Sequence, residues 1–262
     1  MIIVIIIIIL ILLFLLIYIN INSCKNQENF GINNNIPKVI YLSYKTKNIP
    51  DYIIPNIKKL YPEYEIKLYD DNDCKDFLLL NYGQLYVDIF NFLKDGPIKA
   101  DFWRICILYK YGGVYFDLDL EHFINLNEII DNDTDFVTIQ THCKFTCIIK
   151  NELNPAIIIA KQNNTILKQC IDRYIEKYNN KDKYEYWDYS IVVIMTKILK
   201  NTISMKSNES GFYYDKEDNK YQLLLERVPM LKNINNAYIE YNNVKIANAR
   251  YKKYDSTNHT FG

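Results

Sequence analysis

The chain has 262 residues, a formal net charge of zero and three histidines. A neutral chain is a poor match for nucleic acid, whose binding depends on lysine and arginine side chains that neutralise phosphates. Three histidines leave little for a histidine-based metal centre or a histidine base. The length allows one domain with a substantial core after an N-terminal segment.

The first element in chain order is the apolar segment Ile2–Ile19, which contains no charge and no glycine. As a helix rising about 1.5 Å per residue it would span roughly 27 Å, close to the ~30 Å hydrocarbon core of a bilayer. A cleaved signal peptide is the alternative, but its apolar stretch is shorter, follows a basic start and meets a small-residue cleavage site. We therefore predict a transmembrane anchor over residues 1–19 and a polar stem over residues 20–35. The flanking charges do not fix the orientation.

Residues 36–262 alternate between strand-like and helix-like segments, which predicts a single α/β domain with a mixed sheet flanked by helices. Strands are expected at Val39–Leu42, Glu65–Tyr69, from Val114 onward, and Asp135–Gln140. Helices are expected at Cys74–Asn81 behind acidic caps, Leu85–Leu93, from Ile98 toward Tyr111, Pro155–Tyr178 and Val192–Leu199. The segment Phe212–Lys220 is compatible with a hairpin or a loop. Ligands of such a sheet are expected at the carboxyl ends of its strands.

The most informative segment is Tyr109–Leu120, in which an apolar helix ends at Gly112-Gly113 and a strand begins. Glycine tolerates the left-handed backbone that ends a helix. Because side chains alternate along a strand, Tyr115, Asp117 and Asp119 are expected to share one face. The two carboxylates repel each other unless a cation lies between them, and a divalent cation with oxygen ligands is the usual solution. An acidic pair that caps a surface turn is the alternative.

A second charged pair, Asp101 and Arg104, opens the helix that leads to this strand. Residues three apart are neighbours on one helical face, so a local ion pair worth a few tenths of a kcal/mol is one interpretation. The rest of this helix, from Phe102 to Tyr109, is almost wholly apolar and is therefore expected to be buried. A charged pair on a buried helix, followed by a carboxylate pair at the next strand, indicates one site.

The ordered pattern resembles the core signature of the Asp-x-Asp sugar transferases of glycosyltransferase family 32, which large bacterial glucosylating toxins share. The matching residues are Ala100-Asp101-x-x-Arg104 and Leu108-Tyr109-x-Tyr111-Gly112-Gly113-Val114-Tyr115-x-Asp117-x-Asp119. Ile36–Lys45 and Tyr61–Asp70 look like the family's first two strands. The resemblance implies a GT-A type domain that moves a hexose from a nucleotide-diphosphate donor, expected to be a UDP-sugar, to a glycan, lipid or protein hydroxyl with retention of configuration. It also implies a lumenal location in the ER or Golgi.

The resemblance also implies roles for the charged residues. Asp119 would bind Mn²⁺ or Mg²⁺ directly, and Asp117 would contact ribose or metal-bound water. Asp101 would accept hydrogen bonds from donor-sugar hydroxyls, and Arg104 would lie near the ribose or the sugar. Asp101 and Arg104 are thus the predicted catalytic residues.

Three aromatic positions and the C-terminal tail complete the comparison. Tyr115 would line the donor pocket. Where the family's first strand usually has a histidine and a tryptophan, this chain has Tyr41 and Tyr44, and Tyr44 can still stack on a base. The tail lacks the family's closing tryptophan. His259 is either a metal or phosphate ligand there or part of a frayed terminus.

Two other functions remain open from the sequence. A non-catalytic membrane protein that binds nucleotide sugars or carbohydrates through a decayed site is favoured by Tyr41, Tyr44 and the tail, whereas the intact charged residues favour an enzyme. A metal-dependent nucleotidyl or phosphoryl transferase would use the same carboxylates, but no glycine-rich phosphate loop supports it.

The cysteines add little to the functional argument. His142, Cys143 and Cys147 would need a fourth ligand to hold zinc, and a disulfide or plain burial of the two cysteines is equally open. Cys106 is expected to be a small buried apolar residue.

Overall fold

The structure is a computed structural model that describes residues 36–131, 133–142, 151–228, 236–251, 254–255 and 258–261. All of them belong to the compact unit that spans residues 35–262. The predicted anchor and stem, residues 1–35, lie outside the described residues. Among the described helices, none combines the length and apolar character needed to cross a bilayer.

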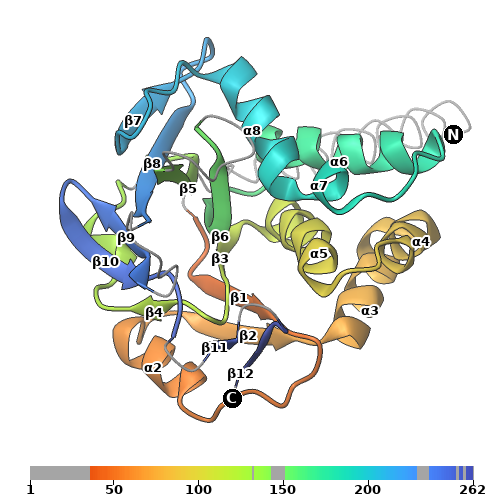
Figure 1. The fold of residues 1–262 in the computed structure, drawn as a ribbon, viewed down its shortest axis with the longest axis horizontal. Helices are drawn as coiled ribbons and strands as arrows, with labels where there is room; N and C mark the ends of the chain where they lie inside the picture. Colours follow the sequence, from red (N-terminus) through yellow and green to blue (C-terminus); the bar gives the residue numbers. More distant parts are fainter. Residues whose placement is uncertain are drawn as a thin grey trace, which may run out of the picture. The chain divides into compact units, whose positions relative to one another are not determined.

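One sheet of ten strands organises this unit (Figure 1), in the order β2-β1-β3-β6-β5-β8-β9-β10-β4 with β7 paired to β8. The strands are β1 (Val39–Ser43), β2 (Glu65–Tyr69), β3 (Gly113–Phe116), β4 (Glu121–His122), β5 (Phe136–His142), β6 (Leu153–Ala160), β7 (Gly211–Tyr214), β8 (Lys220–Arg227), β9 (Tyr238–Tyr241) and β10 (Val244–Asn248). A separate two-stranded ribbon joins β11 (Tyr254–Asp255) to β12 (Thr260–Phe261).

The strand directions bring several strand ends to one edge of the sheet. β1 is parallel to both β2 and β3. β6 is antiparallel to both β3 and β5, so β5 runs in the same direction as β3. β8 is parallel to β5. β9 is antiparallel to both β8 and β10, so β10 also runs in this direction. The carboxyl ends of β1, β2, β3, β5, β8 and β10 therefore share one edge, and the predicted mixed sheet is confirmed.

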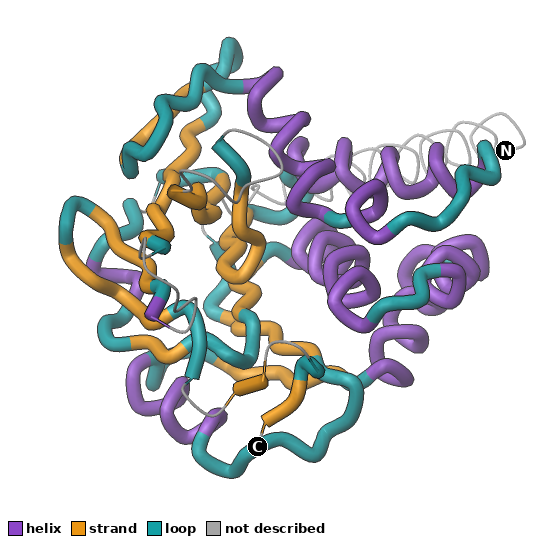
Figure 2. Tube along the Cα trace, viewed as in Figure 1, coloured by secondary structure: helices purple, strands orange, loops and turns teal. Residues whose placement is uncertain are grey.

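Helices cover both faces of the sheet, and Figure 2 shows most of them gathered on one side. The helices are α2 (Ile53–Leu60), α3 (Asp71–Tyr82), α4 (Gln84–Phe92), α5 (Gly96–Tyr111), α6 (Thr165–Asn179), α7 (Tyr186–Tyr189) and α8 (Ile191–Thr202), with a 3₁₀ turn at Leu126–Glu128. One apolar cluster lies between α3–α6, α8 and one face of the sheet. A second cluster lies between α2 and the opposite face.

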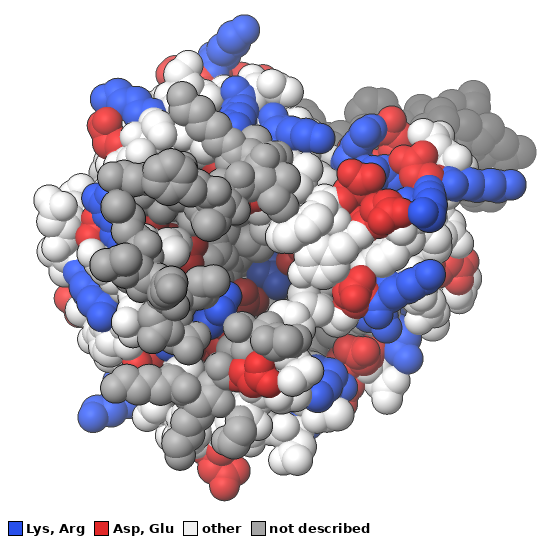
Figure 3. Space-filling model, viewed as in Figure 1, with Lys and Arg blue, Asp and Glu red and all other residues white. Residues whose placement is uncertain are grey.

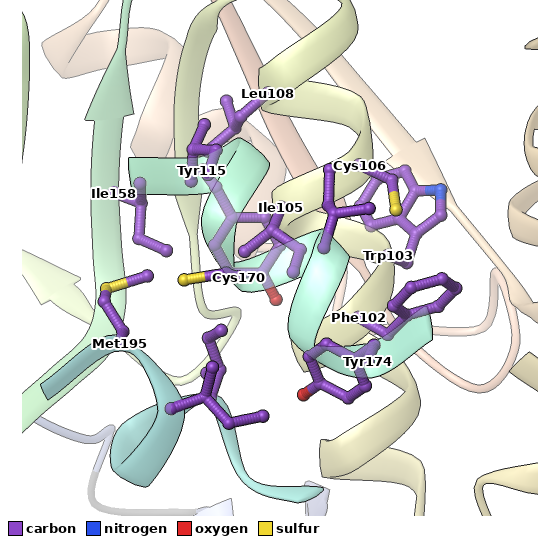
Figure 4. Close-up of a cluster of buried hydrophobic side chains, with 14 of the residues drawn as sticks. Phe102, Trp103, Ile105, Cys106, Leu108, Tyr115, Ile158, Cys170, Tyr174 and Met195 are labelled. Atoms are coloured by element: carbon purple, nitrogen blue, oxygen red, sulfur yellow. The ribbon is translucent and has the colours of Figure 1, made fainter. Parts of the chain in front are cut away.

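The larger cluster is centred on α5, whose residues are buried from Phe102 to Leu108, as its apolar sequence predicts. Figure 4 shows side chains of α5 meeting Tyr115 of β3, Tyr174 of α6 and Met195 of α8. Phe116 belongs to the other cluster. Neighbouring residues of β3 thus point to opposite faces, and α5 is anchored directly behind the strand that leads to the acidic pair.

The predicted elements are confirmed along the first half of the chain. β2 has its predicted bounds, and β1 extends one residue further, to Ser43. Asp70 caps α3 in a reciprocal capping box with Asp73, as the acidic run before this helix predicts. Phe212–Lys220 proves to be a hairpin in which β7 pairs with β8.

The helix predicted over Pro155–Tyr178 is wrong in its first part. Leu153–Ala160 forms strand β6, and the helix α6 begins only at Thr165, capped by Asn164. β6 pairs on both sides and is almost entirely buried, so its run of isoleucines lacks the alternation of a half-exposed strand. Periodicity alone cannot separate such a run from a buried helix.

The glycine pair between α5 and β3 is required by the backbone. Gly112 has φ 67° and Gly113 has φ 110°, both in the left-handed region. A Cβ atom at Gly112 would lie 2.7 Å from the backbone nitrogen of Gln162, and one at Gly113 would lie 2.9 Å from the carbonyl oxygen of Val39. The pair lets the chain turn sharply so that the acidic residues follow immediately after a short strand.

Candidate active site

The acidic pair lies in the turn that follows β3, at the carboxyl edge of the sheet. The Asp117 amide donates to the carbonyl of Ala156 on β6 at 2.9 Å, which holds the turn against the sheet. The Asp119 carbonyl accepts from the amide of Tyr251 at 2.7 Å. The side chains are 30% and 17% exposed for Asp117 and Asp119. Both carboxylates are therefore positioned by backbone contacts and remain reachable.

Arg104 joins the two predicted charged pairs into one cluster. Its guanidinium lies 3.2 Å from an oxygen of Asp101 and 3.2 Å from an oxygen of Asp117. It also donates to the carbonyl of Pro155 at 2.8 Å, and it lies over the ring of Tyr115 at 4.3 Å. Burial alone would lower the pKa of Arg104, and the carboxylates around it raise that pKa above its usual range. The guanidinium is therefore held charged in a buried position.

Asp101 lies behind Arg104, as seen from the cavity described below. Its second oxygen accepts from the amide of Ile191, the first residue of α8, at 3.1 Å. Burial raises the pKa of Asp101 to about 6, while the charge of Arg104 and the Ile191 amide act in the opposite direction. Asp101 thus connects the charged cluster on α5 to the start of α8.

Asp119 faces a second arginine that the sequence pattern did not single out. An oxygen of Asp119 lies 4.0 Å from Nε of Arg250, which follows β10. Burial and the nearby charge of Asp117 raise the pKa of Asp119 to about 7, with Arg250 and Arg104 opposing that shift. Negative charge at this position is therefore only partly compensated by the protein.

A cavity of about 540 Å³ opens over this cluster. Its walls come from the end of β1, the starts of α3 and α5, the turn after β3 and the C-terminal segment. The lining residues are Ser43, Tyr44, Lys45, Asp71, Cys74, Phe90, Lys94, Gly96, Pro97, Lys99, Ala100, Arg104, Tyr115, Asp117, Leu118, Asp119, Arg250, Asn258, His259 and Phe261. Figure 3 shows a hollow near the centre of the view with acidic and basic atoms at its floor.

The predicted aromatic residues occupy two different settings. Tyr115 is buried in the floor, where its hydroxyl donates to Asp117 at 3.0 Å and lies 3.1 Å from the Ser43 hydroxyl. Tyr44 lies on the wall, donates to the backbone carbonyl of His259 at 3.2 Å and packs edge-on against Phe261. The structure therefore brings the C-terminal ribbon to the cavity, with His259 among its lining residues.

The predicted site residues are thus gathered around one cavity. Arg104, Tyr44, Tyr115, Asp117 and Asp119 line it, and Asp101 supports Arg104 from behind.

Sequence reasoning missed Arg250 and also Glu226. The Glu226 carboxylate lies at the carboxyl end of β8 and accepts from Thr141 at 2.9 Å and from Asn154 at 3.1 Å. Glu226 lies near the end of β8 and Arg250 follows β10, so both reach this edge of the sheet through long-range strand pairing, which leaves no local signal in the sequence.

The donor atoms at Asp117 and Asp119 suit a hard divalent cation, because both ligands are carboxylate oxygens. Within the described residues, no group of three or more histidine, cysteine, aspartate or glutamate side chains could hold a metal ion. Mg²⁺ sites commonly combine one or two carboxylates with substrate phosphates and water. The pair therefore fits a cation that is completed by a phosphate-bearing ligand.

The cysteine group of the sequence analysis is not placed, since Cys143 and Cys147 lie outside the described residues. Three described cysteines, Cys74, Cys106 and Cys170, are free and buried. Cys106 packs in the α5 core as a small apolar side chain, as expected.

Comparison with known proteins shows which family the region around this site resembles. Residues 22–136 match the family described as the glycosyltransferase sugar-binding region containing the DXD motif. This part of the chain is therefore similar to the DXD-containing glycosyltransferases. The matched region includes Asp101, Arg104 and the Asp117–Asp119 pair, so the resemblance predicted from the motif is confirmed.

Two curated glycosyltransferases and one solved structure illustrate the relationship. An 88-residue stretch is 35% identical to inositol phosphoceramide mannosyltransferase 3 of Schizosaccharomyces pombe, covering 32% of this chain and 24% of that protein. A 115-residue stretch is 27% identical to lactosylceramide 4-alpha-galactosyltransferase of Mus musculus, covering 44% of this chain and 28% of that protein. The chain thus spans about a quarter of the length of these relatives.

The solved structure called PaToxG Glycosyltransferase superposes with a TM-score of 0.50 at 17% identity, over 70% of this chain and 79% of that chain. At this identity the likeness shows a shared fold. The predicted α/β glycosyltransferase-like architecture is confirmed on that basis.

Proposed function

We propose that this glycosyltransferase moves a hexose from a nucleotide-diphosphate donor to a hydroxyl acceptor in a metal-dependent reaction that retains configuration. The observation that carries the proposal is the buried Arg104–Asp117 ion pair beside Asp119 at the floor of one cavity. A volume of about 540 Å³ suits a ligand of nucleotide-sugar size.

The charges of the floor match the parts of such a donor. Asp117 and Asp119 would hold Mn²⁺ or Mg²⁺, which compensates the charge of the diphosphate leaving group. Arg104 and Arg250 place positive charge on the same floor. The buried ion pairs keep Arg104 oriented before a donor arrives, so little reorganisation is needed.

The sugar and the base of the donor would lie on either side of the cation and the diphosphate. Asp101 holds Arg104, and we assign its remaining lone pairs to a donor-sugar hydroxyl. Tyr44 would stack on the base at the end of β1, and Tyr115 would form the floor below the ribose. A UDP-sugar is our first choice of donor, and mannose and galactose donors deserve equal testing because the two relatives are named for these sugars.

The names of the relatives support our choice of acceptor class. Both are named for ceramide-linked acceptors, one with a phosphoinositol headgroup and one with lactose. We propose a ceramide-linked headgroup as the acceptor of this chain, presented at a membrane to which residues 1–19 anchor the protein, within the secretory pathway.

The direct test is a donor screen with the full chain purified in detergent. A panel of nucleotide-diphosphate sugars is incubated with Mn²⁺, and nucleotide diphosphate release is measured without acceptor. One donor is expected to be hydrolysed slowly, and chelation of the metal should stop the reaction. Metal-dependent nucleotide binding without hydrolysis or transfer of any donor would instead support the decayed binding protein.

The residue test compares Asp119→Asn with Asp172→Asn, an exposed carboxylate that pairs with Lys168 on α6. Asp119→Asn should lose at least about a hundredfold in turnover, since it removes charge that the bound cation requires. Asp172→Asn should retain activity. Full activity of Asp119→Asn with Mn²⁺ present would contradict the metal role.

A further inference from the structure

The segment Tyr184–Tyr189, which contains α7, presents an exposed tryptophan beside the charged cluster. Trp187 is 51% exposed, whereas Trp103, the other tryptophan of the chain, is fully buried. The Trp187 ring packs edge-on against Tyr186 with centroids 5.0 Å apart. Its contact with Tyr186 supports the ring, while much of its surface stays available to a ligand.

Three hydrogen bonds fix this segment to the walls of the site. The Tyr184 hydroxyl donates to Asp95 at 2.5 Å, between the cavity-lining residues Lys94 and Gly96. The Tyr189 carbonyl accepts from the buried Tyr174 hydroxyl at 2.6 Å. Directly after the segment, the Ile191 amide donates to Asp101. The position of α7 is therefore set by α6, by the cap of α5 and, through Asp101, by the helix that carries Arg104.

Tyr186 packs against Trp187 on one side and the apolar core on the other. Its side chain is half-buried. Burial raises the pKa of Tyr186 to about 12, with further contributions from the charges of Asp101 and Asp95 and an opposing one from Arg104. Its hydroxyl therefore lies within electrostatic reach of the residues assigned to the donor sugar.

The segment lies on the opposite side of β3 from Tyr44. Tyr44 follows β1, which pairs with one edge of β3, whereas α8 binds β6, on the other edge, through the Thr196 hydroxyl and the Leu153 amide at 2.9 Å. In Figure 3, uncharged atoms form the side of the hollow where Figure 1 places α5 and α7. The base side of the cavity and the segment that contains α7 thus lie on different sides of β3.

The donor and the acceptor need different kinds of binding surface. A diphosphate needs charged and metal-binding groups, which the floor supplies. The ring of a sugar or a cyclitol has apolar C–H faces that pack on aromatic rings and hydroxyls that hydrogen-bond to polar neighbours. An exposed tryptophan, supported by a tyrosine beside the donor-sugar site, matches the second kind of ligand.

We propose that Trp187 and Tyr186 form the acceptor subsite, in which Trp187 stacks on the headgroup ring that receives the sugar. The inference rests on the proposed transferase function. It assigns to the acceptor a neutral sugar or cyclitol ring, with the Tyr186 hydroxyl as a neighbouring hydrogen-bonding group.

The kinetic test uses the full chain in detergent with lactose and myo-inositol as soluble acceptors. Trp187→Ala should raise the KM for the acceptor about tenfold, while donor hydrolysis without acceptor changes less than about twofold, because the donor wall is untouched. Trp187→Tyr should restore most of the acceptor affinity. The control is Tyr214→Ala on β7, which removes a comparably exposed aromatic ring, at 57% exposure, from another element.

A binding test separates this inference from the proposed function. Since the chain has two tryptophans and Trp103 is buried, a change in fluorescence on adding lactose or myo-inositol should come from Trp187 and disappear in Trp187→Phe. An unchanged acceptor KM in Trp187→Ala, with donor hydrolysis intact, would contradict the acceptor subsite but not the proposed transferase function. Absence of turnover in the unmodified chain would overturn the transferase, and a Trp187-dependent fluorescence change would then still establish a ring-binding site.

Discussion

Arg104 is the residue on which the charges of the site converge. Its guanidinium contacts carboxylates on its own helix and after β3, together with a carbonyl of β6. A buried charge is tolerated only when its partners and hydrogen bonds are complete. The same contacts that stabilise the fold therefore set the geometry of the cavity floor before any donor binds.

A buried histidine should make the stability of the domain depend on pH. The ring of His122 packs on Phe116 at 4.3 Å between centroids, and its Nε2 has no hydrogen-bond partner among the described residues. Burial lowers the pKa of His122 from 6.5 to about 4. The unfolded chain therefore binds a proton below pH 6.5, whereas the folded chain does so only near pH 4.

Below pH 6.5 this difference favours the unfolded chain, so the free energy of unfolding should fall as the pH decreases toward 4. The contribution of His122 is about 2 kcal/mol at pH 5 relative to pH 7. His122→Phe should remove that part of the pH dependence in urea unfolding, whereas His259→Gln, at an exposed position, should keep it. Equal pH dependence in His122→Phe and the unmodified chain would disprove the assignment.

The site residues differ in how far the sequence could predict them. Asp101, Arg104, Asp117 and Asp119 lie in one ordered stretch whose glycines and apolar helix fix their spacing, so the pattern predicts one cluster. Arg250 reaches Asp119 only because the chain after β10 returns to the turn after β3. That proximity depends on strand pairing far along the chain and leaves no local pattern.

At the level of elements, the turn between α5 and β3 should tolerate no side chain. Gly112→Ala is expected to lower the free energy of unfolding by at least about 2 kcal/mol, because a left-handed residue with a Cβ is strained and that atom would clash with the backbone of Gln162. Gly96→Ala is the matched control, since nothing lies within 4 Å of its added Cβ. Urea midpoints compare the two, and equal midpoints would show that the turn can relax.

The elements also show where local pattern stops being informative. α3 carries its own capping box and β3 its own glycines, so both could be placed from neighbouring residues. β6 carries an apolar run that packs on both faces, and this run has the same composition as a buried helix. β6 forms a strand because it pairs with β3 and β5 on either side, and no local sequence feature predicts that pairing.

At the scale of the whole molecule, the carboxyl ends of six strands that run in the same direction lie at one edge of the sheet, and the cavity opens there. Alternating strands and helices were enough to predict an α/β fold with its ligand at that edge. The antiparallel insertion of β6 and the order of β8 to β10 were not predictable, because they depend on contacts between segments far apart in the chain.

The N-terminal segment is expected to keep the full chain in membranes. Its apolar stretch, Ile2–Ile19, is long enough for a bilayer core. After alkaline carbonate extraction, the full chain should remain in the membrane pellet, and a chain that begins at Ile36 should be released. Release of the intact full chain would exclude an anchor, and a shortened N-terminus on the recovered protein would indicate a cleaved signal peptide.

The contact between Phe261 and Tyr44 has a practical consequence for protein production. It places Phe261 among the residues that line the cavity, so a fusion partner joined directly after Phe261 would begin beside that cavity. Such a partner would compete with substrates for access, however well the domain folds. Expression plasmids for transfer assays should therefore carry no tag at this end, and a rate difference between tagged and untagged protein would report how far this end of the chain controls entry.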